Sequence, residues 1–196
     1  MASRSGQRRR QKMAKKSSNT RLVVFAASFI VVAVVIVYAL TAPAGEGTIG
    51  IGSTAPDFHL PIVTAEGLTS NTIELSSLRG RVVVLEFMVS WCKGCQAMAP
   101  SLDYLSSEYE SRGVFFLSVA GTVGGASAES TAAFITEYGA HWTHVLDTDN
   151  SVFTRYGVQV TPTYLIVDRD GKIVSRFQGV VATDGFRAGI DAALSG

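Results

Sequence analysis

Apolar residues form one long run near the N-terminus, followed by short segments that have the period of strands or helices. The long run covers residues 22–40, which carry no charged side chain. At about 1.5 Å per residue, a helix of that length spans roughly 28 Å, close to the ~30 Å hydrocarbon core of a bilayer. The pattern therefore predicts a single transmembrane anchor at residues 22–40.

The composition changes again after this run. Residues 41–56 are rich in glycine and proline, which is typical of a flexible linker. Residues 57–196 have an ordinary length for one domain with its own core, and they contain no internal repeat. With the basic residues 1–21 in front of the apolar run, the chain is predicted to consist of an arm, an anchor, a linker and one domain.

The domain begins with short strand patterns at residues 58–63 and 72–75, with a turn between them. One helical turn is expected at residues 76–80. The strongest strand pattern is at residues 81–88, which are rich in β-branched residues and apolar on both faces apart from Arg81 at the start and one acid. Such a run predicts an interior strand of a sheet that is covered on both sides.

Helical and strand periods alternate through the rest of the domain. The predicted elements are a helix at 96–112, a strand at 114–120, a helix at 128–138, a helical turn at 151–156, a hairpin of strands at 163–167 and 172–177, and a last helix at 183–194 capped by Thr183. Alternation of this kind predicts an α/β domain with a mixed central sheet flanked by helices.

Charge is distributed very unevenly behind a net value of +1. Residues 1–21 contain eight Lys or Arg and no acid, whereas residues 42–196 contain nine basic and sixteen acidic residues, a net charge of −7. Because the basic flank of a membrane span stays in the cytoplasm, we expect a single-pass protein of the cell membrane. Its N-terminus would be cytoplasmic and its domain extracytoplasmic.

The N-terminal region has two alternative interpretations. Basic runs also occur in nucleic-acid-binding proteins, but here the apolar run follows at once, so no nucleic-acid partner is expected. A cleaved signal peptide competes with an uncleaved signal-anchor, because Ala42-Pro43-Ala44 contains small residues. The apolar run exceeds the ~7–15 residues usual in signal peptides, and Pro43 interrupts the site, which favours the anchor.

The chain has only two cysteines, Cys92 and Cys95, which lie between the strongest strand and the following helix. A Cys-x-x-Cys pair in that setting is typical of a redox dithiol. A zinc site would need four ligands, and the three histidines are scattered, so no metal or other cofactor is expected. A permanent structural disulfide would close too small a loop to stabilise much.

The residues around this pair resemble the thioredoxin superfamily. The resemblance rests on Trp91-Cys92-Lys93-Gly94-Cys95, on Glu86 within the preceding strand, and on Val160-Thr161-Pro162-Thr163 before the hairpin. The opening Ala55-Pro56-Asp57-Phe58, the N-terminal hairpin and the single anchor are similar to its TlpA/ResA branch of membrane-tethered thiol-disulfide oxidoreductases. The resemblance covers residues 53–196 and implies a thioredoxin-like fold with an N-terminal hairpin extension.

Three residues are expected to carry the chemistry. A helix that starts at the motif stabilises a Cys92 thiolate at its N-terminus, and Lys93 adds positive charge, which lowers a cysteine pKa from ~8.5 into the ~3.5–7.5 range. Cys95 would be the buried resolving thiol. By resemblance, Glu86 would be a buried proton acceptor for Cys95. Its alternatives are exposure to solvent, or pairing with Lys93 or Arg81.

Further residues are expected to bind the substrate or tune the pair. By resemblance, Pro162 is cis and faces the dithiol, and Thr161 offers its backbone to an extended substrate. Trp91 is expected to be a partly exposed platform rather than a core residue. The chain departs from many branch members at Gly94, where they carry proline, and at Gln96-Ala97-Met98-Ala99, where some carry glutamate. Both departures concern redox tuning and leave the direction of electron flow open.

The predicted function is extracytoplasmic dithiol–disulfide exchange on partner proteins through Cys92 and Cys95, as a reductant. Cytochrome c maturation is the best-known use of the family, and a tethered reductant implies a membrane electron donor of the CcdA/DsbD kind. The alternatives are a redox-inert tethered chaperone, an oxidant that forms disulfides, and a peroxiredoxin-like peroxidase. A peroxidase would want threonine three residues before the reactive cysteine, where this chain has Val89.

Overall fold

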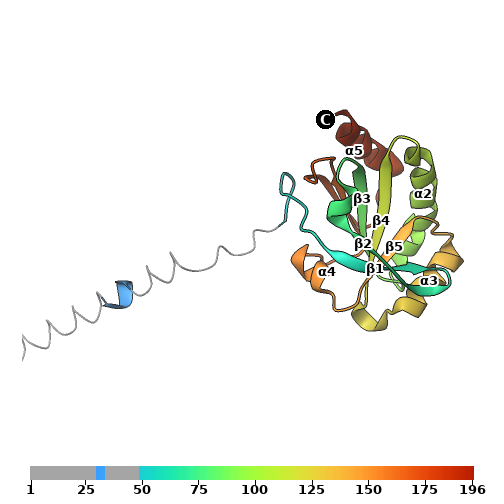
Figure 1. Cartoon of the computed structure of the whole chain (residues 1–196), viewed down its shortest axis with the longest axis horizontal. Coiled ribbons are helices and arrows are strands. Elements are labelled where there is room, and N and C mark those ends of the chain that lie inside the picture. The colour runs from blue at the N-terminus through green and yellow to red at the C-terminus, as the bar shows by residue number, and fades with distance from the viewer. Residues whose placement is uncertain (1–29, 34–48) are drawn as a thin grey trace, which may run out of the picture. The chain divides into compact units, whose positions relative to one another are not determined.

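The computed structural model of the chain describes residues 30–33 and 49–196. Residues 30–33 are helical, and residues 49–196 form the folded domain (Figure 1). Within these two described ranges, no helix is both long and apolar enough to cross a membrane. The predicted arm at 1–21, and the predicted anchor at 22–40 apart from its central turn, lie outside the described residues.

The domain is built on one sheet of seven strands in the order β2-β1-β5-β4-β3-β6-β7. The strands are β1 (His59–Thr64), β2 (Gly67–Glu74), β3 (Val82–Met88), β4 (Val114–Gly121), β5 (Thr143–Asp147), β6 (Thr163–Val167) and β7 (Ile173–Gln178). β3 runs parallel to β4 and antiparallel to β6, so the sheet is mixed, as predicted. Every residue of β3 is buried because the strand lies inside a sheet covered on both faces.

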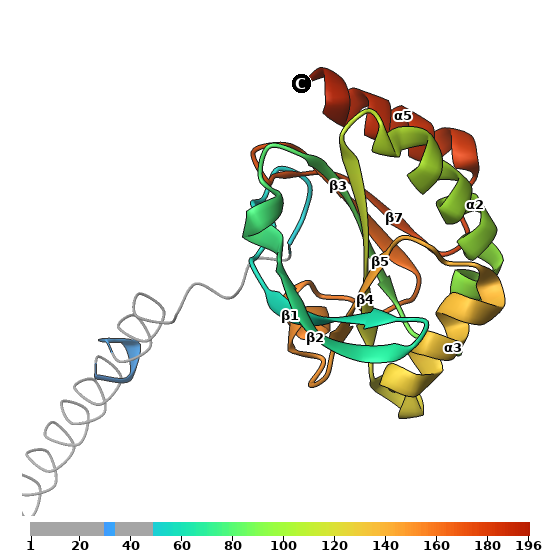
Figure 2. The ribbon, with the colours of Figure 1, turned by 45° about the vertical axis from the view of Figure 1, so that its right-hand side comes forward.

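Helices cover both faces of this sheet. The helices are α2 (Lys93–Glu110), α3 (Ala128–Tyr138), α4 (Ser151–Arg155) and α5 (Thr183–Ser195), with 3-10 turns η1 (Leu75–Leu78) and η2 (Val123–Gly125). Figure 2 shows α5, α2 and α3 side by side on one face. α4 lies against the other face, where the Phe153 ring meets the Phe87 ring of β3 at 5.4 Å between centroids.

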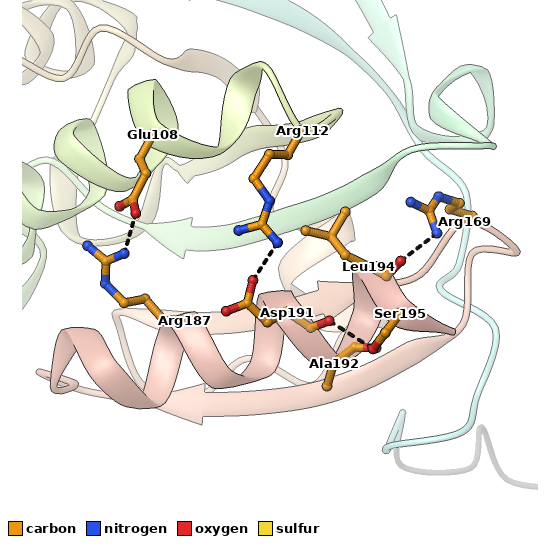
Figure 3. A network of polar contacts seen from close by, with 8 residues as sticks. All are labelled: Glu108, Arg112, Arg169, Arg187, Asp191, Ala192, Leu194 and Ser195. Atoms are coloured by element: carbon orange, nitrogen blue, oxygen red, sulfur yellow. Dashed lines mark hydrogen bonds and ion pairs between the residues drawn. The ribbon is translucent and has the colours of Figure 1, made fainter.

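The C-terminal end of α2 and the turn that follows it are joined to α5 by two ion pairs (Figure 3). Arg112 pairs with Asp191 at 2.8 Å, and Arg187 pairs with Glu108. Exposed ion pairs of this kind are worth at most about 1 kcal/mol each. The larger contribution comes from apolar residues of α5, such as Phe186, which are fully buried between the two helices and the sheet. α2 is therefore held firmly over the sheet.

Most predicted elements are present within a few residues, and the N-terminal hairpin of β1 and β2 is formed, although β2 begins at Gly67 rather than at residue 72. At the end of the predicted linker, the Ala55 N–H donates to the Gly171 carbonyl at 2.9 Å. Two further details differ from expectation. The N-cap position of α5 is Ala182, which makes no side-chain cap, rather than Thr183. β5 was not predicted, because its five residues include a histidine and an aspartate and show no clear alternation of polar and apolar residues.

Candidate active site

The Cys-x-x-Cys pair lies where β3 ends and α2 begins. Cys92 is the N-cap of α2, and its Sγ accepts a hydrogen bond from the backbone N–H of Cys95 at 3.2 Å. A disulfide joins the two residues, whose Cα atoms are 5.3 Å apart. Cys92 keeps a 5% exposed fraction, whereas Cys95 is completely buried. The helix N-terminus therefore stabilises negative charge on the sulfur of Cys92.

Gln96 holds the dithiol loop in shape, a role that the sequence reasoning missed. Its Nε2 donates to the Ser90 carbonyl at 3.0 Å, and its Oε1 accepts from Lys93 Nζ at 3.1 Å. Its backbone N–H also donates to the Cys92 carbonyl at 3.0 Å. One side chain thus ties the strand end to the first turn of the helix. The Cys-x-x-Cys spacing does not contain that information.

The proline loop lies against the dithiol motif at Gly94. The Thr161–Pro162 peptide bond is cis. A Cβ placed on Gly94 would lie 2.9 Å from Pro162 Cδ, so the loop and the motif are in close contact and a side chain at Gly94 would force a shift. The Pro162 carbonyl is bound by the Gly179 N–H at 2.8 Å. Within residues 49–196, no hydrogen bond uses the backbone of Thr161.

Trp91 is an exposed aromatic side chain beside Cys92. Its exposed fraction is 53%, and its Nε1 donates to the Val123 carbonyl at 3.0 Å. The indole lies over Gly124, where a Cβ would be 2.9 Å from the ring. That glycine also has a φ of +64°, a conformation that L-residues rarely adopt. The loop between β4 and α3 therefore holds the indole in place at the surface.

Glu86 is buried in β3, with an exposed fraction of 2%. The Ser118 hydroxyl donates to its Oε2. Burial raises the pKa of this carboxyl from its ordinary 4.5 to about 7, against the opposing effect of the Ser118 hydrogen bond. The alternative pairings are not formed, since Lys93 binds Gln96 and Arg81 lies over the Phe115 ring. In the described domain, no hydrogen bond joins this carboxyl to either cysteine.

Two aromatic residues near Glu86 were not assigned to the site by the sequence. Trp142 Nε1 donates to Ser118 Oγ at 2.6 Å, which links the indole to the carboxyl. His144 is buried on β5, and its Nδ1 donates to the Trp142 carbonyl at 2.8 Å. Burial lowers the pKa of His144 to about 4, so the imidazole is neutral at physiological pH. Had β5 been predicted as a strand, His144 would have been placed on it and Trp142 directly before it.

A helix-capping dithiol beside a cis proline, on a mixed sheet flanked by helices, defines a thiol-disulfide oxidoreductase with a thioredoxin-like fold. Residues 51–194 match the Redoxin family model, and the chain belongs to this family. Thiol-disulfide oxidoreductase ResA of Bacillus subtilis is 34% identical over 138 residues, which cover 70% of this chain and 73% of that protein. The TlpA/ResA resemblance is therefore confirmed.

Solved structures agree with this assignment. A protein assigned as the thiol:disulfide interchange protein DsbE of Chlorobium tepidum superposes with a TM-score of 0.66 at 28% identity, covering 74% of this chain and 99% of that one. A secreted Mycobacterium tuberculosis disulfide oxidoreductase, homologous to Escherichia coli DsbE, has a TM-score of 0.58 at 25% identity, covering 69% and 95%. The similarity covers the domain that carries the dithiol.

Proposed function

We propose that this protein is an extracytoplasmic, membrane-tethered reductant of disulfides in partner proteins. The observation that carries the proposal is the pair of sulfurs itself: Cys92 caps a helix and keeps a 5% exposed fraction, whereas Cys95 is completely buried. The basic arm at 1–21 and the apolar run at 22–40 support tethering with the domain outside the cytoplasm. Named thiol-disulfide oxidoreductases among the relatives favour exchange chemistry over a redox-inert module.

The reaction is a two-step exchange. The Cys92 thiolate attacks one sulfur of the partner disulfide, forming a mixed disulfide and releasing the other partner sulfur as a thiolate. Cys95 then loses its proton and attacks Cys92 Sγ, which re-forms the Cys92–Cys95 bond and releases the second partner thiolate. Two electrons pass from this dithiol to the partner, and the two proton equivalents of the dithiol leave with or beside the reduced partner.

Neighbouring residues assist the two steps. Glu86 takes the proton of Cys95, for which a pKa of about 7 makes it suitable near neutral pH. The free backbone groups of Thr161 bind an extended segment of the partner beside its cysteine. Trp91 supplies an exposed aromatic surface next to Cys92 in the chain, and the exposed Lys93 contributes positive charge. Gly94 leaves room for Pro162 next to the pair.

Each turnover leaves Cys92 and Cys95 joined as a disulfide, so the dithiol must be reduced again before the next turnover. A domain outside the cytoplasm has to receive its electrons through the membrane, which calls for a donor of the CcdA/DsbD kind. Partners of the type used in cytochrome c maturation would consume those electrons. The reverse direction, in which the protein forms disulfides in partners, differs only in the redox potential of the pair.

The reduction potential of the Cys92–Cys95 pair tests the direction. It is measured in the purified full-length chain by thiol trapping in redox buffers. A value of about −250 mV or lower supports a reductant, whereas a value near −120 mV identifies an oxidant. In cells, a Cys95→Ser variant is expected to accumulate mixed disulfides with its partners. Cys92→Ser is the matched control, and equal trapping by both variants would contradict the assigned order of attack.

The two cysteines also report on which side of the membrane the domain lies. Because the chain has no others, a membrane-impermeant maleimide added to intact, reduced cells labels this protein only at the dithiol. Labelling before lysis is expected for an extracytoplasmic domain. Labelling that appears only after lysis would place the domain in the cytoplasm and would contradict the tethering geometry, while leaving the exchange chemistry intact.

A further inference from the structure

Four polar residues form a continuous row across the interior of the sheet. Tyr164 of β6 pairs with Glu86 of β3, Glu86 pairs with Ser118 of β4, and Ser118 pairs with His144 of β5. Each has an exposed fraction of 2% or less. Directly paired residues point to the same face of a sheet, so these side chains are neighbours beneath the helices. A buried polar row of this kind is costly unless its hydrogen bonds are specific.

Hydrogen-bond direction on one side of Glu86 is fixed by Trp142. An indole Nε1–H is a donor only, so Ser118 Oγ must accept from it at 2.6 Å. A hydroxyl has one hydrogen, and that of Ser118 is thereby left to donate to Glu86 Oε2. Oε2 therefore receives a hydrogen bond whether the carboxyl is charged or neutral. A proton bound to Oε2 would lie against the Ser118 hydroxyl hydrogen and be repelled by it.

The other side of Glu86 has no such constraint. The Tyr164 hydroxyl is close enough to lower the pKa of the carboxyl, yet neither it nor Oε1 makes a hydrogen bond of standard geometry within residues 49–196. A phenol hydroxyl both donates and accepts. It is thus able to donate to an ionised Oε1 and to accept from a protonated one.

We propose that Trp142 and Ser118 are positioning residues that confine the exchangeable proton of Glu86 to Oε1, on the Tyr164 side of the row. The inference rests on the proposed role of Glu86 in exchange. When Cys95 gives up its proton, the carboxylate gains it at Oε1, the Tyr164 hydroxyl turns from donor to acceptor, and Ser118 does not move. No electron is transferred in this step.

The surroundings leave few other groups that titrate. Glu86 shares its face of β3 with Val82 and Val84, whose apolar cluster includes Met98 and Leu102 of α2 and Phe186 of α5. His144, the last member of the row, stays neutral above about pH 4, and the pKa of Tyr164 is raised by burial and by Glu86. No charged side chain in the described domain contributes to the raised pKa of Glu86.

The first test measures the midpoint of the Glu86 titration by ¹³C-carboxyl NMR. The full-length chain is used in detergent and in its oxidised form, so that the cysteines do not titrate, and the signal is assigned by its loss in Glu86→Gln. Ser118→Ala removes a donor that binds the charged carboxylate more strongly than the neutral acid, and it is expected to raise the midpoint by about one pH unit. Tyr164→Phe removes a partner of both the charged and the neutral carboxyl, so it should shift the midpoint by less than Ser118→Ala does.

Two tryptophan variants test whether Trp142 acts on Glu86 through Ser118. Trp142→Phe releases the Ser118 hydrogen and is expected to raise the midpoint by about half a pH unit, less than Ser118→Ala. Trp91→Phe, which changes the other tryptophan of the chain, should leave the midpoint unchanged. Equal midpoints in the two tryptophan variants would remove Trp142 from the network. A fall of the midpoint in Ser118→Ala would show that Ser118 accepts the proton of Glu86.

Fluorescence tests whether Trp142 senses the carboxyl through Ser118. In the Trp91→Phe chain, Trp142 is the sole tryptophan, and its emission is expected to titrate with the same midpoint as the NMR signal. The titration should disappear in Glu86→Gln and lose most of its amplitude in Ser118→Ala. Persistence of the titration in Glu86→Gln would assign it to another group and would overturn the inference. None of these readouts needs turnover, so their failure is distinct from failure of the proposed function.

Discussion

Glu86→Gln isolates the energetic consequence of burying this carboxyl. Glutamine keeps the shape of the side chain and an oxygen that accepts from Ser118, but it has no charge to bury. The pKa of Glu86 lies at about 7 in the fold against an ordinary 4.5. At about 1.4 kcal/mol per pH unit, ionising it inside the sheet costs about 3 kcal/mol.

The sign follows from proton linkage. Between these two pH values the native state holds a proton that the unfolded state has lost, so the protonated carboxyl stabilises the fold below pH 4.5 and this contribution is lost as pH rises to 7. His144 acts in the opposite sense, because its pKa falls from 6.5 to about 4. The contributions of Glu86 and His144 to the pH dependence of stability therefore nearly cancel in the parent protein. The contribution of Glu86 is seen only in the difference in unfolding free energy between variant and parent.

The assay is urea unfolding of the oxidised domain, followed by circular dichroism at several pH values from 4 to 8. The free energy of unfolding of Glu86→Gln, relative to the parent, is expected to increase by about 3 kcal/mol across that range. Groups that titrate equally in both proteins drop out of the comparison. A difference that stays constant within about 0.5 kcal/mol would show that Glu86 does not titrate at a raised pKa, and the reasoning would fail.

Two further variants test neighbouring features. His144→Asn keeps a donor near the Trp142 carbonyl but cannot be protonated, so its unfolding free energy relative to the parent should rise by about 3 kcal/mol as pH falls from 6.5 to 4, measured by the same urea series. Gly94→Ala should lower stability by about 1–3 kcal/mol and slow disulfide exchange, because its Cβ meets the Pro162 ring. Gly185→Ala in α5 is the matched control, since a Cβ there makes only ordinary contact at 3.9 Å, and an equal loss in both variants would refute the packing argument.

Much of this domain follows from local patterns in the sequence. The apolar run that becomes β3, the helical spacing that becomes α2 and the turn signal between β6 and β7 each reflect a requirement of one element alone. The position of Cys92 at a strand-to-helix junction is also local, and it predicts the N-cap geometry that the structure has. These features need only the periodicity of the backbone and the residues that stop it.

Tertiary structure decided the surroundings of the dithiol and of Glu86. β5 pairs with β1 and β4. It is a strand because it is buried between these partners, and its own sequence shows no clear alternation of polar and apolar residues. Its position brings Trp142 to Ser118, 24 residues away in sequence, and Ser118 to Glu86, 32 residues away. Strand register sets these pairs, and register depends on how the whole sheet packs under its helices. The sequence alone therefore determined the chemistry of the site, whereas the fold determined which neighbours surround it, because those contacts join residues that no local period relates.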